Sequence, residues 1–240
     1  MSTPRAGDDD FLRLTGVQAY YGESHILHGV DLSVRRGEVV TLLGRNGAGR
    51  TTTLKAILGL VGRRTGSVLI NGVEAVDMAP YQIARLGIGY CPEERGIFAS
   101  LNCEENLLLP PEVARGGMSL DEIYTLFPNL RERRESPGMR LSGGEQQMLA
   151  VARILRTGAK LLLLDEISEG LAPVIVQTLA RTIATLRERG FTIVMVEQNF
   201  RFAARLADRF YVMEHGRIVE GFAAAELDAK MGLLHEYLGI

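Results

Sequence analysis

The chain has 240 residues, 46% of them hydrophobic, which is enough apolar material for one core and predicts a single domain. Its 27 basic and 29 acidic residues leave a net charge of −2. This overall charge does not predict strong electrostatic attraction to nucleic acid or to anionic lipid. Two cysteines are too few for a disulfide framework, and no apolar run reaches the ~18 residues of a membrane helix. Residues 1–10 lack the pattern of a signal peptide, so we expect a disordered tail on a cytoplasmic protein.

The N-terminal part predicts strands followed by a strand, loop and helix. Residues 12–20 and 30–34 alternate in polarity, which is typical of half-buried strands. Residues 39–43 form an apolar run that predicts a buried strand. A helix is expected from Thr51, because four apolar residues share one helical face: Leu54, Ile57, Leu58 and Val61.

The middle of the chain predicts short elements and then a helical lobe. Residues 67–70 and 88–91 are expected to be strands, with a brief helix at 81–86 between them. After residue 92 the strand pattern ends, and a pair of prolines and a pair of glycines interrupt the sequence. Ser119 to Glu122 forms a capping box that predicts a helix through Phe127.

The C-terminal half alternates predicted helices with apolar strands, which indicates a parallel α/β core. Helices are expected at 141–155 and 174–188 and at the C-terminus, and strands at 161–164, 192–196 and 209–213.

A phosphate-binding loop is one residue short of complete between Gly44 and Thr52, because Arg50 occupies the place of the usual lysine. Glycines let such a loop curl, so that backbone N–H groups and a helix N-terminus face one anion. Arginine keeps the charge on a wider planar group, which favours nucleotide binding and leaves open whether phosphoryl transfer is efficient. Only 3 of the 27 basic residues are lysine, so a general drift toward arginine is an alternative explanation.

Two further motifs complete a nucleotide site. Asp165 and Glu166 follow an apolar strand, where one carboxylate can hold hydrated magnesium and the other can orient a water molecule. The string from Leu141 to Gln147, Leu-Ser-Gly-Gly-Glu-Gln-Gln, predicts an anion-binding helix start.

Together these motifs resemble the nucleotide-binding subunits of ATP-binding cassette (ABC) transporters. The resemblance implies an α/β fold: a P-loop NTPase parallel-sheet core with an N-terminal antiparallel β subdomain and a small helical subdomain. It implies a single ABC ATPase domain over residues 11–240, with a helical lobe at about 95–150. The strings Val-Glu-Gln-Asn at 196–199 and Tyr-Leu-Gly at 237–239 are similar to the branched-chain amino acid importer branch.

The resemblance also implies ATP and Mg²⁺ as cofactors and assigns roles to residues. Tyr21 would stack on adenine, Thr51, Glu93 and Asp165 would serve the magnesium ion, and Glu166, Gln198 and Arg50 would be catalytic. The loop residues would wrap the phosphates: Gly44, Arg45, Asn46, Gly47, Ala48, Gly49, Arg50, Thr51 and Thr52. The signature would act in trans on the nucleotide of a second subunit: Leu141, Ser142, Gly143, Gly144 and Glu145.

The function implied is an ATP-hydrolysing subunit that energises an importer of branched-chain amino acids or a related amide or urea solute. Its expected partners are transmembrane permease subunits, an identical or different second ATPase subunit and, indirectly, a solute-binding protein, at the cytoplasmic face of the membrane. Two departures from the family pattern, Arg50 and Ile167, keep open a regulatory subunit with weak hydrolysis. A soluble cassette acting on DNA or ribosomes is disfavoured, because the sequence has no long coiled-coil insertion, tandem cassette or basic face.

Overall fold

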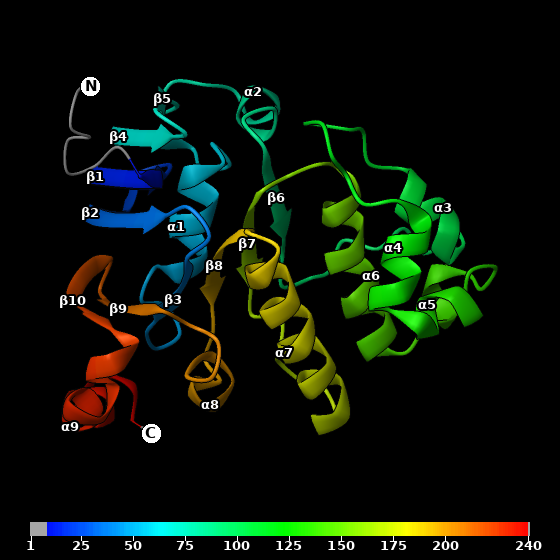
Figure 1. Ribbon diagram of the computed structural model, residues 1–240. Helices are drawn as coiled ribbons and strands as arrows, with labels where there is room; N and C mark the ends of the chain where they lie inside the picture. Colours follow the sequence, from blue (N-terminus) through cyan, green and yellow to red (C-terminus); the bar gives the residue numbers. More distant parts are fainter. Residues whose placement is uncertain (1–8, 240) are drawn as a thin grey trace, which may run out of the picture.

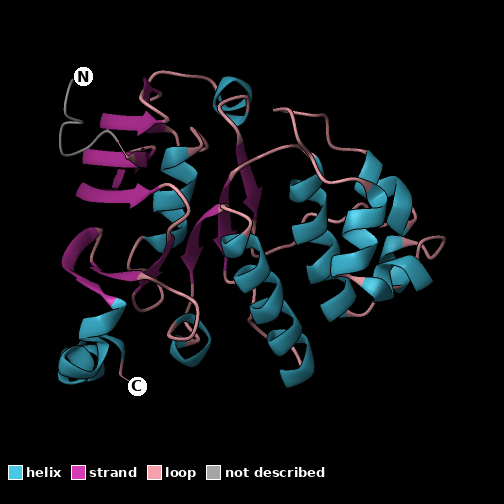
Figure 2. Ribbon diagram, viewed as in Figure 1, coloured by secondary structure: helices cyan, strands magenta, loops and turns pink. Residues whose placement is uncertain are grey.

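The computed structural model describes residues 9–239, which form two sheets flanked by helices (Figures 1 and 2). The smaller sheet is antiparallel, in the order β2-β1-β4-β5. Its strands are β1 (Asp10–Tyr21), β2 (Ser24–Arg35), β4 (Arg63–Ile70) and β5 (Val73–Glu74). Strand β1 begins at Asp10, and the carbonyl of Asp9 accepts a hydrogen bond from the Arg36 amide, so these two residues do not belong to the expected tail. Residues 1–8 of that tail lie outside the described residues.

The larger sheet is mostly parallel and has the order β10-β9-β3-β8-β7-β6. Its strands are β3 (Val39–Leu43), β6 (Ile88–Cys91), β7 (Leu161–Asp165), β8 (Thr192–Val196), β9 (Arg209–Glu214) and β10 (Arg217–Ala223). Strand β8 lies between β3 and β7 and pairs in parallel with both. The predicted strands at 39–43 and 192–196 are confirmed at both ends, because each is an uninterrupted buried run.

The helices cover the larger sheet and form the lobe beside it. They are α1 (Arg50–Ile57), α2 (Pro80–Ala84), α3 (Cys103–Leu108), α4 (Leu120–Leu126), α5 (Pro128–Glu132), α6 (Gly143–Arg156), α7 (Pro173–Glu188), α8 (Phe200–Ala203) and α9 (Leu227–Leu238), with 3₁₀ turns η1 (Gly138–Arg140) and η2 (Ala224–Glu226). Figure 1 shows α3, α4 and α5 grouped on one side of the larger sheet, and the antiparallel sheet on the other. Within residues 9–239, no helix is both long and apolar enough to cross a bilayer.

The central strands are buried on both faces, which explains their continuous apolar sequence. Leu161 and Leu163 of β7 belong to the cluster formed with α1 and the antiparallel sheet. Leu162 and Leu164 belong to the cluster formed with α6 and α7. This alternation follows from the two-residue period of a strand, and it fixes the sheet between two hydrophobic layers.

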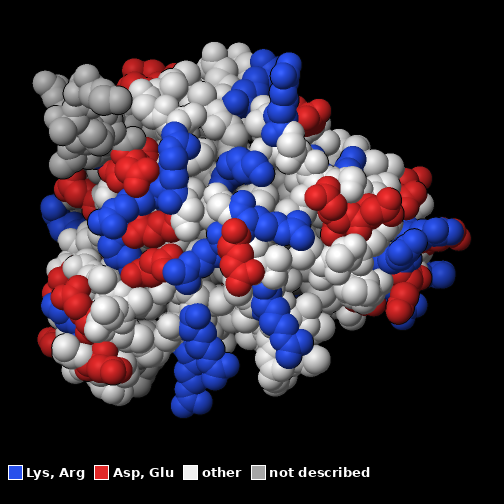
Figure 3. All heavy atoms as spheres, in the orientation of Figure 1, with Lys and Arg blue, Asp and Glu red and all other residues white. Residues whose placement is uncertain are grey.

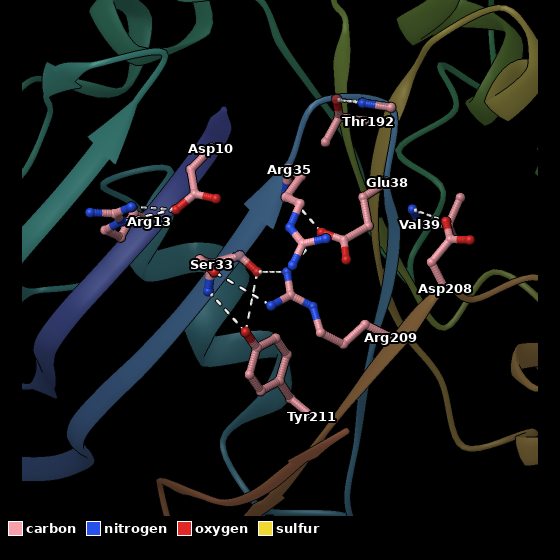
Figure 4. Close-up of polar contacts among 11 residues, drawn as sticks. Asp10, Arg13, Ser33, Arg35, Glu38, Val39, Thr192, Asp208, Arg209 and Tyr211 are labelled. Carbon is pink, nitrogen blue, oxygen red and sulfur yellow. Dashed lines mark hydrogen bonds and ion pairs between the residues drawn. The ribbon is translucent and has the colours of Figure 1, made fainter. Parts of the chain in front are cut away.

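Polar contacts join the antiparallel sheet to the larger one (Figure 4). Arg209 of β9 donates to the backbone carbonyl of Ser33 on β2 at 2.6 Å and pairs with Glu38 at 2.7 Å. The hydroxyl of Tyr211 also donates to the Ser33 carbonyl, at 3.2 Å. The start of β3 is held as well, because the Val39 amide donates to Asp208 at 2.9 Å. These bonds fix β3, and with it the loop that β3 feeds, against β2.

Helix α1 is shorter than predicted, because it ends at Ile57 rather than continuing through Val61. Gly59 has a φ of +73°, a conformation that stops a helix and that glycine adopts at little cost. The guanidinium of Arg64, on β4, donates to the last carbonyls of the helix, those of Ala56 and Ile57. The same guanidinium donates to the carbonyls of Val76, Ala75 and Met78.

Replacing this guanidinium should therefore destabilise the fold. We expect Arg64→Met to lower the free energy of unfolding by about 2–4 kcal/mol, since several partly buried carbonyls lose a charged donor. Arg64→Lys should restore only part of the loss, because an ammonium cannot reproduce the planar fork. Arg63→Met is the matched control: the Arg63 guanidinium carbon lies over the Tyr20 ring, 4.1 Å from its centroid, and the substitution should cost less than about 1 kcal/mol. Chemical denaturation measures all three, and equal losses at positions 63 and 64 would contradict the assignment.

Candidate functional site

A cavity of about 430 Å³ lies where β3, β7 and β8 end. Since the carboxyl ends of parallel strands meet at one edge of a sheet, this is the expected place for a site in an α/β protein. Its lining includes nine of the residues expected from the sequence: Asn46, Gly47, Gly49, Arg50, Thr51, Thr52, Glu93, Glu166 and Gln198. Ile26 and Glu169 also line it and were not expected. Glu169 could have been suspected from its place three residues after Glu166; Ile26 carries no such signal.

The loop between β3 and α1 is curled by its glycines. Gly47 and Gly49 have φ values of +81° and +105°, which residues with a Cβ rarely adopt. Gly44 has no room for a Cβ, because such an atom would lie 2.5 Å from the Met213 carbonyl oxygen. The Ala48 amide closes a turn by donating to the Arg45 carbonyl at 3.0 Å. The loop therefore has the shape of an anion-binding turn at a helix start.

Arg50 is buried and spreads its guanidinium over three acceptors. One terminal nitrogen lies 2.8 Å from Glu166 Oε1 and 3.2 Å from Asn46 Oδ1. The other donates to the Glu197 carbonyl at 3.0 Å. A lysine ammonium at this position could not span these acceptors in the same way, so arginine joins the loop directly to the acidic residue expected to be catalytic.

Glu166 is held in an uncommon conformation between two donors. Its φ is +48°, and its amide donates to the Val196 carbonyl at 2.8 Å. The Gln198 side-chain amide donates to Oε2 at 2.8 Å, while Arg50 pairs with Oε1. Burial raises the pKa of the Glu166 carboxyl and lowers that of the Arg50 guanidinium, and the attraction between the two opposes both shifts. Non-glycine residues in this backbone region are concentrated at functional sites.

Thr51 and Asp165 present the oxygens that a magnesium ion would require. The Thr51 hydroxyl donates to Asp165 Oδ1 at 3.0 Å, and the Tyr90 hydroxyl donates to Oδ2 at 3.1 Å. Burial raises the pKa of the Asp165 carboxyl, against the effect of these two hydrogen bonds. A hydroxyl beside a carboxylate at the start of a phosphate-binding helix is the donor set that Mg²⁺ prefers, so these residues fit the expected ion. The carboxylates of Glu93, Glu166 and Glu169 also lie within 4.8 Å of one another, and all three residues line the cavity.

Burial of charge singles out this site from the rest of the described chain. Among residues 9–239, the charged side chains that are buried are Arg50, Asp165, Glu166 and Glu197, and all four lie at this one site. Burying charge is costly unless it is paired and hydrogen-bonded. A cluster that concentrates it beside a cavity is the arrangement typical of functional sites.

The other expected residues do not line the cavity. Gly44, Arg45 and Ala48 belong to the loop that lines it, and Asp165 bonds to Thr51 of the lining. Tyr21, at the end of β1, is exposed and is absent from the residues that line the cavity. The five signature residues, 141–145, are likewise absent from that lining. Ser142 caps α6, since its hydroxyl accepts from the Glu145 amide at 3.3 Å while Glu145 Oε2 accepts from the Ser142 amide at 2.7 Å. Gly144 packs so closely on Ile175 that a Cβ would lie 2.7 Å from it.

Glu197 is a site residue that the sequence analysis did not single out. Its side chain is 1% exposed, and its two carboxylate oxygens accept hydrogen bonds from the Ser168 amide at 3.2 Å and the Ser168 hydroxyl at 2.7 Å. Burial raises the pKa of this carboxyl from 4.5 to about 7, against the effect of the two hydrogen bonds. The partner lies 29 residues earlier in the chain, so no local pattern reveals the contact.

Comparison with known families places this geometry in context. The sequence model of the family described as "ABC transporter" matches residues 27–169. The high-affinity branched-chain amino acid transport ATP-binding protein BraG of Pseudomonas aeruginosa is 43% identical over 93% of this chain and 97% of its own. The probable branched-chain amino acid transport ATP-binding protein LivF of Archaeoglobus fulgidus is 36% identical, over 90% and 93%. The lipopolysaccharide export system ATP-binding protein LptB of Escherichia coli K12 is 32% identical, over 92% and 94%.

Solved structures share the fold. The ADP conformation of an ATP-binding cassette of an ABC transporter superposes with a TM-score of 0.78 and 21% identity, covering 96% of this chain and 99% of that one. A dimeric cassette in a post-hydrolysis state with ADP and phosphate has a TM-score of 0.77 and 24% identity, covering 89% and 98%. These likenesses confirm the predicted P-loop NTPase fold with an antiparallel β subdomain.

The raised pKa of Glu197 generates a prediction about stability. A carboxyl that titrates near 7 when folded and near 4.5 when unfolded destabilises the ionised protein, so stability is lost as the pH rises from about 4.5 through about 7. Glu197→Gln has no such titration, and its free energy of unfolding relative to the parent should therefore increase by about 2–3 kcal/mol between pH 5 and pH 8. Denaturant unfolding at both pH values measures this change, and parallel pH curves would contradict the assignment. Glu188→Gln, at the C-terminal end of α7, is the control.

Proposed function

The chain belongs to the ABC transporter family of ATPases, and we propose that it energises an importer of branched-chain amino acids or a related amide or urea solute. The observation that best supports ATP hydrolysis is the contact of Glu166 with both Arg50 and Gln198, beside the hydrogen-bonded pair Thr51–Asp165. The proposed transported solute is supported by the similarity to BraG and LivF, whose names state branched-chain amino acid transport. The similarity to LptB makes export the competing direction.

The cavity suits a nucleotide held by its phosphates. In this proposal the loop from Gly44 to Thr52 binds the phosphates through backbone N–H groups, and Tyr21 stacks on the adenine from outside the cavity. Thr51 and Asp165 would hold Mg²⁺, and Glu93 lines the same cavity as Thr51. When bound, the ion neutralises the negative charge of the phosphates.

The catalytic assignment follows from which groups face the cavity. Glu166 orients and polarises the attacking water, and Gln198 fixes the carboxylate by its hydrogen bond and can donate to a γ-phosphate oxygen. Arg50 is bound to Glu166 in the described arrangement, and phosphate oxygens compete with that carboxylate for the guanidinium. Binding of ATP is therefore expected to redistribute the hydrogen bonds of Arg50.

The partners proposed are permease subunits in the membrane, reached from the cytoplasmic face, and a second ATPase subunit, identical or different. Residues 141–145 would close over the nucleotide of that second subunit, which is consistent with their absence from the lining of the cavity. A solute-binding protein would act only through the permease. Nucleic acid is not a proposed partner: the net charge is −2, and basic and acidic side chains intermingle on the face shown in Figure 3.

A second candidate function is a regulatory subunit that binds nucleotide but hydrolyses it weakly. The observation that favours it is the Arg50–Glu166 ion pair, which engages the carboxylate that would act on water. Mispositioning of a catalytic group by about 1 Å can cost about a hundredfold in rate, so a persistent pair would suppress turnover.

Magnesium-dependent ATP turnover separates the two candidates. We expect the purified chain to hydrolyse ATP, with a rate per subunit that rises with protein concentration because the complete site needs two subunits. Glu166→Gln should lower kcat by at least about a hundredfold through loss of the carboxylate. Arg50→Lys should stay within about tenfold of the parent, because the positive charge remains. A silent parent that Arg50→Lys makes active would instead establish the regulatory subunit.

Uptake by whole cells tests the cargo and the direction. Cells lacking the chain should lose uptake of labelled leucine, isoleucine or valine, and the parent gene should restore it while a Glu166→Gln gene should not. Loss of amide or urea uptake would assign the cargo to that class. Normal uptake of all these solutes, together with a defect in export, would overturn the importer assignment.

A further inference from the structure

Glu197 joins two segments that carry the expected catalytic groups. It directly follows β8, and its carboxylate accepts both hydrogen bonds that Ser168 can donate, from the hydroxyl at 2.7 Å and from the amide at 3.2 Å. Ser168 is itself buried and lies two residues after Glu166. The segment that follows Glu166 is therefore tied through Ser168 to the residue that follows the neighbouring strand.

Glu197 is also linked to the other two catalytic candidates, to Arg50 by a hydrogen bond and to Gln198 because it is the next residue in the chain. Its backbone carbonyl accepts from the Arg50 guanidinium at 3.0 Å. The next residue along the chain, Gln198, donates to Glu166 Oε2 at 2.8 Å. Displacement of Glu197 would thus move an acceptor of Arg50 and a donor to Glu166 at the same time.

We propose that Glu197 is a positioning residue for ATP hydrolysis, whose buried carboxylate holds Ser168 and thereby fixes Glu166, Gln198 and Arg50 relative to one another. Glu197 does not line the cavity in which the nucleotide is placed, and it acts through the three residues that do. The inference rests on the proposed ATPase function and adds to it the element that keeps the catalytic carboxylate in place.

The cost of burying this carboxylate supports a role beyond packing. In the part of the chain that the structure describes, no ion pair joins the Glu197 carboxylate to a basic side chain. A buried carboxylate without a cation is unfavourable, and a glutamine of the same shape would avoid that cost. Glutamine, however, replaces one acceptor oxygen by an NH₂ donor, so it cannot reproduce the pairing of the Ser168 amide with Oε1 and of the Ser168 hydroxyl with Oε2. The carboxylate is the group that satisfies both.

The backbone of Glu166 explains why such an anchor would be needed. A non-glycine residue with a φ of +48° is held there only by its surroundings, since the conformation costs of the order of 1 kcal/mol. The hydrogen bonds on either side of it are those of its own amide to Val196 and of the Glu169 amide to its carbonyl. Release of Ser168 would remove the next fixed point and let the segment relax.

The test compares single and double variants of the anchor by steady-state kinetics. Ser168→Ala and Glu197→Ala should each lower kcat by about 10–100-fold, while KM for ATP and the dissociation constant of the nucleotide stay within about twofold. The double variant should be no worse than the worse single one, because both remove one interaction. Glu197→Gln and Ser168→Thr should recover part of the loss. Thr178→Ala, which removes a hydroxyl bonded to a backbone carbonyl on α7, is the control.

Hydrogen exchange supplies a readout that does not depend on turnover. In the nucleotide-free protein, amides 167–171 should lose protection in Glu197→Ala and keep it in Thr178→Ala. Lost protection with unchanged kcat would overturn the positioning role, as would additive kinetic losses or an equal rise in KM. If the parent itself does not hydrolyse ATP, the proposed function fails and the catalytic role of Glu197 fails with it, whereas the exchange result still decides whether Glu197 anchors the segment.

Discussion

The parallel pairing of β3, β8 and β7 is the constraint on which the site depends. Val196 at the end of β8 lies opposite Leu42 on one side and Asp165 on the other, so the three strands finish at one level. The phosphate-binding loop and the Glu197–Gln198 dipeptide follow the ends of β3 and β8, and the acidic pair Asp165–Glu166 spans the end of β7. Residues as far apart in sequence as Arg50 and Glu166 then meet at 2.8 Å. No single helix or loop of the chain could assemble this set.

Arginine in the phosphate-binding loop changes the site in a way that charge alone does not describe. Its two terminal nitrogens reach a carboxylate, a side-chain amide and a backbone carbonyl from three segments. The ammonium of a lysine, on its flexible side chain, would favour the centre of the loop. The planar guanidinium of arginine favours fixed acceptors at the edge of the loop. The guanidinium thus contributes to the internal order of the nucleotide-free site, and the Glu166 carboxylate is held between Arg50 and Gln198 before any ligand arrives.

The sequence predicted the elements whose signal is local and missed the contacts whose partners are distant. Continuous apolar runs identified β3 and β8 to the residue, and a capping box located α4. The short helices α3, α5 and α8 were not predicted from the sequence, because each has six residues or fewer and shows no helical period. The early end of α1 depends on Gly59 and on Arg64 from another strand. The motifs identified nine residues that line one cavity, but the partners of Arg50 and Glu197 follow from strand order, which a single sequence does not state.

The charge balance of the site points to what must accompany a nucleotide. Glu93, Asp165, Glu166, Glu169 and Glu197 lie in or beside the cavity, and Arg50 is the basic residue in its lining. Phosphate groups brought next to this set meet more negative than positive charge, and at low dielectric that repulsion is large. Backbone N–H groups of the loop offset part of it, and a divalent cation on Thr51 and Asp165 would offset more. Burial is the largest cause of the raised pKa values of Asp165 and Glu166, and repulsion from neighbouring carboxylates acts in the same direction, while hydrogen bonds to both carboxyls and the charge of Arg50 beside Glu166 oppose it. An acidic site of this kind would bind an anion most favourably together with a cation, and the Thr51 hydroxyl at the start of α1 beside the Asp165 carboxylate at the end of β7 offers oxygens for that cation.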